Sequence, residues 1–170
     1  GDFKGRKLVN FKASHIRPTS DRVKESVFNI IANEIPDARV LDLFSGTGNL
    51  TLECLSQGAQ FVTCVEKSSK SLKIMRENFK AFDVEDRVDV VQKDVLKFLR
   101  PHEGEAFDLI LIDPPFTEKM SDEVLSVLSN SKVLHSESLI VIESTKHETV
   151  TESYGLLQVV DTRHYGDKLV

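Results

Sequence analysis

Residues 39–49 of the chain have the sequence RVLDLFSGTGN, and this stretch decides the fold. The apolar run at 39–44 predicts a buried β-strand, and the two glycines that follow predict a tight turn into a helix that begins at Asn49. In open α/β sheets such a turn lies at the carboxyl end of a strand, where backbone N–H groups can meet a ligand. The stretch therefore predicts an α/β domain that binds a small molecule.

The same order of short apolar run, turn and helix repeats along the chain, as expected for βαβ units. Strands are predicted at 39–44, 60–66, 87–92, 107–112 and 138–143, and helices after the first four, at 49–57, 68–82 and 95–99 among others. Several of these strands are apolar on both faces, as buried parallel strands are. The pattern predicts a Rossmann-like, mostly parallel sheet with helices on both faces.

The segments on either side of this core are less regular. Apolar residues from Val23 to Ile31 recur at helical spacing, so a helix is expected from Thr19 or Ser20 to a point before Pro36. Residues 1–13 suggest a small hairpin or extended arm, and 156–160 with 168–170 suggest a terminal strand pair. The stripe of Leu72, Met75, Phe79 and Phe82 in the helix at 68–82 is expected to be core.

Length and composition fit one domain. The chain has 170 residues, 40% of them hydrophobic and 29% charged, and we expect a single domain over 1–170, with a basic arm or hairpin at 1–18 and an α/β body at 19–170. It has no apolar run of membrane-spanning length and no signal-peptide pattern, so we expect a cytoplasmic protein with no membrane partner. A monomer is expected, although the sequence itself does not determine the oligomeric state.

Cysteine and histidine spacing argues against a metal site. Cys54 and Cys64 lie inside apolar stretches without the close pairing that zinc or redox motifs require, so buried reduced thiols are expected. The histidines show no helical pairing to a second ligand, and no metal is expected; they are His15, His102, His135, His147 and His164.

Charge is divided unevenly along the chain. The net charge is −5, but residues 1–24 contain seven basic residues against Asp2 and Asp21. The seven are Lys4, Arg6, Lys7, Lys12, Arg17, Arg22 and Lys24. A basic end on an acidic body is a candidate nucleic-acid contact, and the alternative is an ordinary solvated terminus.

The acids at the strand ends indicate which small molecule binds. Residue 51 is Thr, so the dinucleotide pattern GxGxxG is incomplete, while Asp42 lies inside the strand before the turn. This combination favours S-adenosylmethionine over a pyrophosphate ligand. Glu66, twenty residues beyond Gly46, is placed to accept hydrogen bonds from the ribose hydroxyls. Asp94, after the third strand, could accept from the adenine amino group, cap the helix at 95–99, or do both.

The fourth strand delivers Asp113-Pro114-Pro115-Phe116 to the same edge of the sheet. An exocyclic amine on a base is a poor nucleophile, because its lone pair is delocalised into the ring. The Asp113 carboxylate and the Pro114 carbonyl could accept its two N–H bonds and turn the lone pair outward, and Phe116 could stack on the base. Whether Asp113 also takes the proton is left open, and an isolated Asp-Pro-Pro could equally be a stiffened loop.

Several longer segments resemble the bacterial RsmD family of 16S rRNA guanine-N2 methyltransferases. They are GRKL at 5–8, RPTSDRVKESVFNII at 17–31, LDLFSGTGNLTLECLSQGA at 41–59, LIDPPF at 111–116 and YGDKL at 165–169. The segment at 17–19 is the most specific, because the glycine turn and DPPF recur across many amino-methyltransferases.

The resemblance implies methylation of guanine 966 of small-subunit RNA by a class I S-adenosylmethionine-dependent methyltransferase with a seven-stranded sheet whose last strand is antiparallel. S-adenosylhomocysteine would be the product, and 16S rRNA or the small subunit the partner. By motif, Asp113, Pro114 and Phe116 would be catalytic or base-binding. The cofactor would be held by Asp42, Phe44, Ser45, Gly46, Gly48, Glu66, Lys67, Asp94 and Val95. RNA would be bound by Lys4, Arg6 and Lys7, and Arg17 and Thr19 could touch the RNA or the cofactor.

Two other classes of function stay open. DPPF also serves amino-methyltransferases that act on adenine N6 in DNA or RNA, or on a protein glutamine. A non-catalytic RNA-binding module that retains the fold would be expected to lose Asp113 or Glu66, and both are present.

Overall fold

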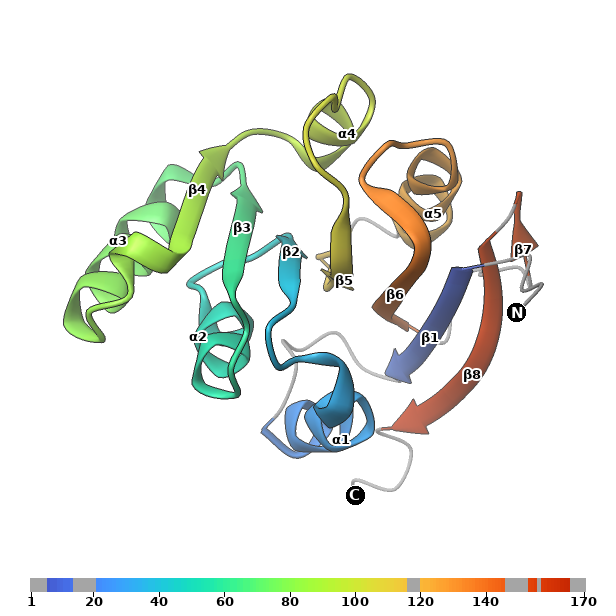
Figure 1. The fold of residues 1–170 in the computed structure, drawn as a ribbon, viewed down its shortest axis with the longest axis horizontal. Helices are drawn as coiled ribbons and strands as arrows, with labels where there is room; N and C mark the ends of the chain where they lie inside the picture. The colour runs from blue at the N-terminus through green and yellow to red at the C-terminus, as the bar shows by residue number, and fades with distance from the viewer. Residues whose placement is uncertain (1–5, 14–20, 116–119, 146–152, 156, 166–170) are drawn as a thin grey trace.

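The structure is a computed structural model that describes residues 6–13, 21–115, 120–145, 153–155 and 157–165. Helices and strands alternate along most of this length, as Figure 1 shows. The strands are β1 (Arg6–Ala13), β2 (Arg39–Leu43), β3 (Phe61–Glu66), β4 (Val88–Gln92), β5 (Phe107–Ile112), β6 (Leu134–Thr145), β7 (Ser153–Tyr154) and β8 (Leu157–Tyr165). The α-helices are α1 (Asp21–Ile31), α2 (Asn49–Ser56), α3 (Ser69–Ala81), α4 (Val95–Leu99) and α5 (Ser121–Ser129). Short 3₁₀ turns follow α1 at Ala32–Glu34 and precede β4 at Glu85–Arg87.

The βαβ prediction is confirmed. The strands form one sheet in the order β4-β3-β2-β5-β6-β1-β8-β7, and β2 through β6 are mutually parallel. The predicted bounds of β2 to β5 agree within one residue, whereas β6 is longer than the predicted 138–143. In parallel strands all carboxyl ends lie at the same edge, so the turns after β2, β3, β4 and β5 meet there.

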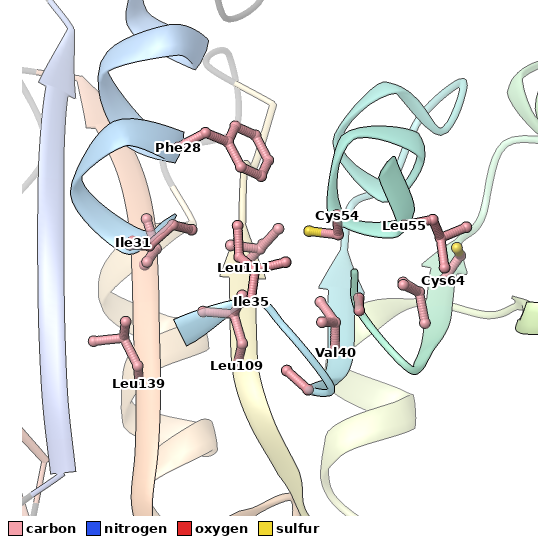
Figure 2. Close-up of a cluster of buried hydrophobic side chains, with 14 of the residues drawn as sticks. Phe28, Ile31, Ile35, Val40, Cys54, Leu55, Cys64, Leu109, Leu111 and Leu139 are labelled. Carbon is pink, nitrogen blue, oxygen red and sulfur yellow. The ribbon is translucent and has the colours of Figure 1, made fainter. Parts of the chain in front are cut away.

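Helices cover both faces of the sheet, because successive strand residues point to opposite faces. Val40 and Cys64 face one side with Leu109, Leu111 and Leu139, and α1, α2 and α3 pack over them. Figure 2 shows part of this cluster, with Phe28 of α1 above the β5 side chains. On the other side α4 and α5 cover a second cluster that includes Leu41, Ile110 and Ile140. Both faces of the central strands are therefore shielded from solvent.

The N-terminal segment departs from the expected hairpin. Residues 6–13 form β1, which pairs in parallel with β6 on one side and with β8 on the other. The partner strands β6 and β8 are far from β1 in the sequence, so the local apolar pattern of residues 1–13 does not indicate the pairing. That pattern by itself therefore suggested a separate arm. Residues 6–13 of the basic segment are thus part of the sheet.

The seven-strand expectation is corrected in the same region. The sheet has eight strands across the described residues, and the last, β8, runs parallel to β1. The antiparallel strand is the short β7, which pairs with β8 across a turn at Gly155. Of the predicted terminal pair, 156–160 falls largely within β8 and 168–170 lies outside the described residues.

Helix α3 confirms most of its predicted stripe. Leu72, Met75 and Phe79 are buried, but Phe82 is 67% exposed, so its assignment to the core was wrong. Phe82 is the C-cap, one residue beyond the last helical residue, where helical periodicity no longer holds. Cys54 and Cys64 are buried free thiols, as predicted.

Hydrogen bonds also join the amino ends of three strands. The Asp108 carboxylate on β5 accepts from the Arg39 amide of β2 at 2.9 Å and lies 2.8 Å from the His135 ring of β6. Burial by itself raises the pKa of Asp108, but these bonds and the neighbouring charges hold it below its usual range. The central strands are therefore tied together at the edge opposite the candidate site.

Candidate functional site

The glycine turn after β2 has the backbone that its sequence predicts. Phe44, Gly46 and Gly48 have φ values of 60°, 56° and 89°, in the left-handed region. The Ser45 amide donates to the Val65 carbonyl at 3.1 Å and the Gly48 amide to the Ser45 carbonyl at 2.9 Å. The turn is thus folded back on itself and attached to β3 before α2 begins at Asn49.

Glu66 holds this turn through its side chain. One carboxylate oxygen accepts from the Gly46 amide at 2.8 Å, and the other accepts from the Ser68 amide at 2.9 Å. Each oxygen keeps a further lone pair for another donor. The structure therefore brings together Gly46 and Glu66, two residues that the sequence assigned to one ligand.

Asp42 lies beneath the turn and is fully buried. Its Oδ2 accepts from the Thr51 hydroxyl at 2.6 Å, while Oδ1 has no hydrogen-bond partner among the described residues. Burial raises the pKa of Asp42 to about 7; the Thr51 hydrogen bond opposes the rise, and repulsion from Asp113 and Glu66 adds to it. A cationic group bound nearby would offset this repulsion.

These features fit a ligand that carries positive charge and a sugar. Asp42 offers an unused buried acceptor, and a Cβ built on Gly46 would meet no atom within 4 Å, so the backbone there borders open space. Glu66 offers charged acceptors beside that space. Thr51, which sequence reasoning noted only as a missing glycine, is the residue that holds Asp42.

At the end of β4, Asp94 caps α4. Its Oδ2 accepts from the Leu96 amide at 3.0 Å and the Lys97 amide at 3.3 Å, so the capping prediction is confirmed. The Lys93 amide donates to the Glu66 carbonyl at 3.2 Å, which places Asp94 near the end of β3. Val95 is buried, whereas Lys67 is exposed. A role for Asp94 toward adenine stays a prediction.

The predicted catalytic loop begins where expected. Asp113 follows β5 and is half-buried, and Pro114 is buried. Asp113 is close enough to Asp42 to repel its charge, so the predicted catalytic and cofactor residues share one site. Phe116, Arg17, Thr19 and Lys4 lie outside the described residues, and of Arg6 and Lys7 only the backbone in β1 is described.

Sequence reasoning missed Glu143 as a site residue. It was identified only as the end of a strand, although an acid at that position parallels Glu66 at the end of β3. In the structure Glu143 is 8% exposed and borders a pocket together with Asp113 and with residues of α1 and α2. The signal was an acidic residue directly after the apolar run at 139–142 of β6.

The exposed face of α3 was also missed. It presents four basic side chains, and no ion pair of theirs is found among the described residues; the four are Lys70, Lys73, Arg76 and Lys80. Glu77 is the acidic residue on the same face. This face lies at the β4 edge of the sheet, far from β1, as Figure 1 shows.

Searches for other kinds of site were negative within the described part of the chain. No group of three or more His, Cys, Asp or Glu side chains there could hold a metal ion. None of the described helices is long and apolar enough to cross a bilayer.

Comparison with known proteins yields consistent matches. The family model described as "Conserved hypothetical protein 95" matches residues 1–170. The chain is 34% identical to ribosomal RNA small subunit methyltransferase D of Escherichia coli over 85% of this chain and 72% of that protein. It is 32% identical to the protein of the same name from Haemophilus influenzae, over 93% of this chain and 84% of that protein.

Solved structures agree with the fold. An Escherichia coli protein described as "Putative methyltransferase yhhF" superposes with a TM-score of 0.69 at 33% identity, covering 76% of this chain and 70% of that one. The predicted Rossmann-like class I methyltransferase fold is confirmed.

We predict that the glycine turn tolerates a side chain at Gly46 better than at Gly48. A Cβ at Gly48 would lie 2.8 Å from the Phe79 ring, in addition to the backbone strain that both positions share. Gly46→Ala should therefore lower the free energy of unfolding by about 1 to 2 kcal/mol, and Gly48→Ala by about 2 to 5 kcal/mol. Urea denaturation of both variants measures the difference. Equal losses would mean that Phe79 moves aside and that packing does not restrict this turn.

Proposed function

Because the chain belongs to the family described as conserved hypothetical protein 95, the RsmD family, we propose that it is an S-adenosylmethionine-dependent methyltransferase of small-subunit ribosomal RNA. We further propose that its target is the exocyclic N2 amino group of a guanine, guanine 966 by the family resemblance. One observation supports this proposal most directly: the glycine turn that Glu66 binds and the loop that begins at Asp113 lie at the same edge of the sheet.

The residues around the turn bind the cofactor in this proposal. S-adenosylmethionine, when bound, supplies a methyl group made electrophilic by a positively charged sulfur. Glu66 accepts hydrogen bonds from the ribose hydroxyls with the lone pairs that Gly46 and Ser68 leave unused. Asp42 lies close enough for its charge to favour a cationic ligand, and Asp94 uses one oxygen for α4 and keeps the other for adenine. The rest of the proposed cofactor site is lined by Phe44, Ser45, Lys67 and Val95.

Asp113 and Pro114 act on the amine. The Asp113 carboxylate accepts one N–H of the exocyclic amino group and the Pro114 carbonyl accepts the other, so the nitrogen lone pair is turned away from the ring. Burial of Pro114 and half-burial of Asp113 keep water from competing for these bonds. Phe116 stacks on the base. Positioning of this kind supplies most of the rate when the methyl group is already activated.

A transfer assay tests the function directly. Labelled methyl groups from S-adenosylmethionine are offered to naked 16S rRNA, small ribosomal subunits, DNA and protein, and the products are digested to nucleosides or amino acids. N2-methylguanosine is the expected product. N6-methyladenine or methylglutamine would instead support one of the rival amino-methyltransferases, and cofactor binding with no transfer to any substrate would support a non-catalytic module.

Replacement of Asp113 separates binding from chemistry. Asp113→Ala should lower the single-turnover rate at saturating RNA by at least ~100-fold, because the amine loses its charged acceptor, while cofactor affinity stays nearly unchanged. A rate close to that of the wild type would exclude Asp113 as the group that positions the amine.

We predict that Glu66 contributes strongly to cofactor affinity. Glu66→Ala removes acceptors from both the ribose and the Gly46 amide, and should weaken S-adenosylmethionine binding by about 2 kcal/mol, or roughly 30-fold. Glu66→Gln keeps one acceptor oxygen, so its affinity for S-adenosylmethionine should lie between those of the wild type and Glu66→Ala. Glu77→Ala on the exposed face of α3 is the control. Titration calorimetry that shows equal affinity for Glu66→Ala and Glu77→Ala would remove Glu66 from the cofactor site.

We also predict that the basic N-terminal segment binds RNA phosphates. Each engaged Lys or Arg adds roughly 0.7 to 0.9 to the slope of log affinity against log salt. Joint replacement of Lys4, Arg6 and Lys7 by Ala should therefore flatten the slope by about two to three units, with cofactor binding unchanged.

A triple variant of α3 provides a matched comparison. Lys73, Arg76 and Lys80 have the same composition, two lysines and one arginine, and lie at the opposite side of the sheet. If the slope flattens with the α3 variant and keeps its parental value with the N-terminal variant, the RNA lies across α3. The prediction for the N-terminal segment would then be wrong.

A further inference from the structure

Glu143 is a buried carboxylate next to the proposed catalytic loop. It follows Ile142 at the carboxyl end of β6, as Asp113 follows Ile112 at the end of β5, and Ile112 and Ile142 are register partners. The next residues along two parallel strands are neighbours about 4.8 Å apart and point to the same face. Asp113 and Glu143 are therefore expected on the same face of the sheet, and both border one pocket with residues of α1 and α2.

One pocket is bordered by both carboxylates. Among the described residues, its other walls come from α1, α2 and the strands and are apolar except for Lys24: Lys24, Val27, Phe28, Leu50, Leu111, Ile112 and Val141. Lys24 lies 3.8 Å from Glu53 of α2. A hydrogen-bond acceptor in apolar surroundings distinguishes strongly between ligands that donate to it and ligands that do not. A ligand without the matching donor leaves the buried acceptor unpaired, and the full desolvation penalty of that group remains.

Glu143 directly follows an apolar run in β6. The four residues before Glu143 in β6, Leu139 to Ile142, are buried and apolar. The bonds that Asp113 and Pro114 make in the proposed reaction do not use Glu143. A substrate that brings two adjacent donors would use both acids.

Guanine has this arrangement on its Watson–Crick edge. Its N1–H and its N2 amino group are adjacent donors, whereas adenine presents an amino group next to N1, which is an acceptor. A carboxylate opposite adenine N1 would leave two acceptors facing each other. The paired acids thus match guanine and oppose adenine.

We propose that Glu143 accepts the N1–H of the target guanine while Asp113 accepts from its N2 amino group, so that Glu143 selects guanine over adenine-like bases. This inference rests on the proposed function, since it assigns the specificity of the same site. Glu143 is a specificity-determining residue here, and the methyl transfer itself depends on Asp113.

The test uses a base that differs from guanine at N1 and C6. In the RNA that the transfer assay identifies as substrate, the target guanine is replaced by 2,6-diaminopurine, which keeps the N2 amino group but has an acceptor at N1. The wild-type enzyme should favour guanine by at least ~100-fold in kcat/KM, because a site built to bind an N–H strongly rejects an analogue that lacks it. Glu143→Gln supplies an amide N–H to the N1 acceptor, so the preference should fall at least ~10-fold, with the rate on 2,6-diaminopurine rising.

Two further variants complete the experiment. Glu137→Gln makes the same change at an exposed position of β6 and should keep the wild-type preference. Glu143→Asp keeps the charge but shortens its reach, so it should lower kcat/KM on guanine at least ~10-fold and retain the preference for guanine. Cofactor affinity should be unchanged in all three variants and reports that each is folded.

The outcomes separate the two proposals. If no RNA acquires N2-methylguanosine, the proposed function itself fails. If the wild type forms N2-methylguanosine but uses 2,6-diaminopurine equally well, or if Glu143→Gln keeps the wild-type preference, the role of Glu143 is overturned. Should Glu143→Gln fail to fold, a Glu143→Asp rate equal to that of the wild type would overturn it as well.

Discussion

The carboxylate of Glu66 is the link on which the site depends. It accepts hydrogen bonds from the Gly46 and Ser68 amides, and so fixes the turn after β2 to the end of β3. Bonds to an ionised acceptor are stronger than neutral ones. Because β2 also pairs with β5, the same link determines where the turn lies relative to Asp113. A residue expected to bind the ligand thus also builds the surface that receives it.

The acids of the site share one face for a simple geometric reason. Side chains alternate along a strand, and Asp42, Glu66 and Asp113 each lie an even number of residues from a side chain in the α1–α3 cluster: Val40, Cys64 and Leu111. Burial raises the pKa of Asp42 to about 7, and repulsion from Asp113 and Glu66 adds to the rise. A cationic ligand and N–H donors would offset this repulsion, so the electrostatics of the site and of the proposed ligands are complementary.

Charge is segregated along the chain, and the proposed RNA substrate gives this a physical reason. A polyanionic substrate is repelled by carboxylates at the sheet edge, so its attraction must come from elsewhere on the surface. Basic residues occur on α3, beside the β4 edge, and in the segment that includes β1, which lies within the sheet between β6 and β8. In the proposed function, these bases would attract the RNA phosphates while the acids bind donors of the cofactor and the base.

The sequence by itself determined the strands from β2 to β5, the glycine turn, and Glu66 and Asp113 at strand ends, because these depend on local periodicity and on residues near one another in the chain. Tertiary structure alone decided the place of β1 between β6 and β8, the parallel direction of β8, the Thr51 bond to Asp42, and Glu143 beside Asp113. Each of these joins segments whose pairing has no local periodicity to mark it. These contacts depend on strand register and on burial, and both exist only in the folded chain.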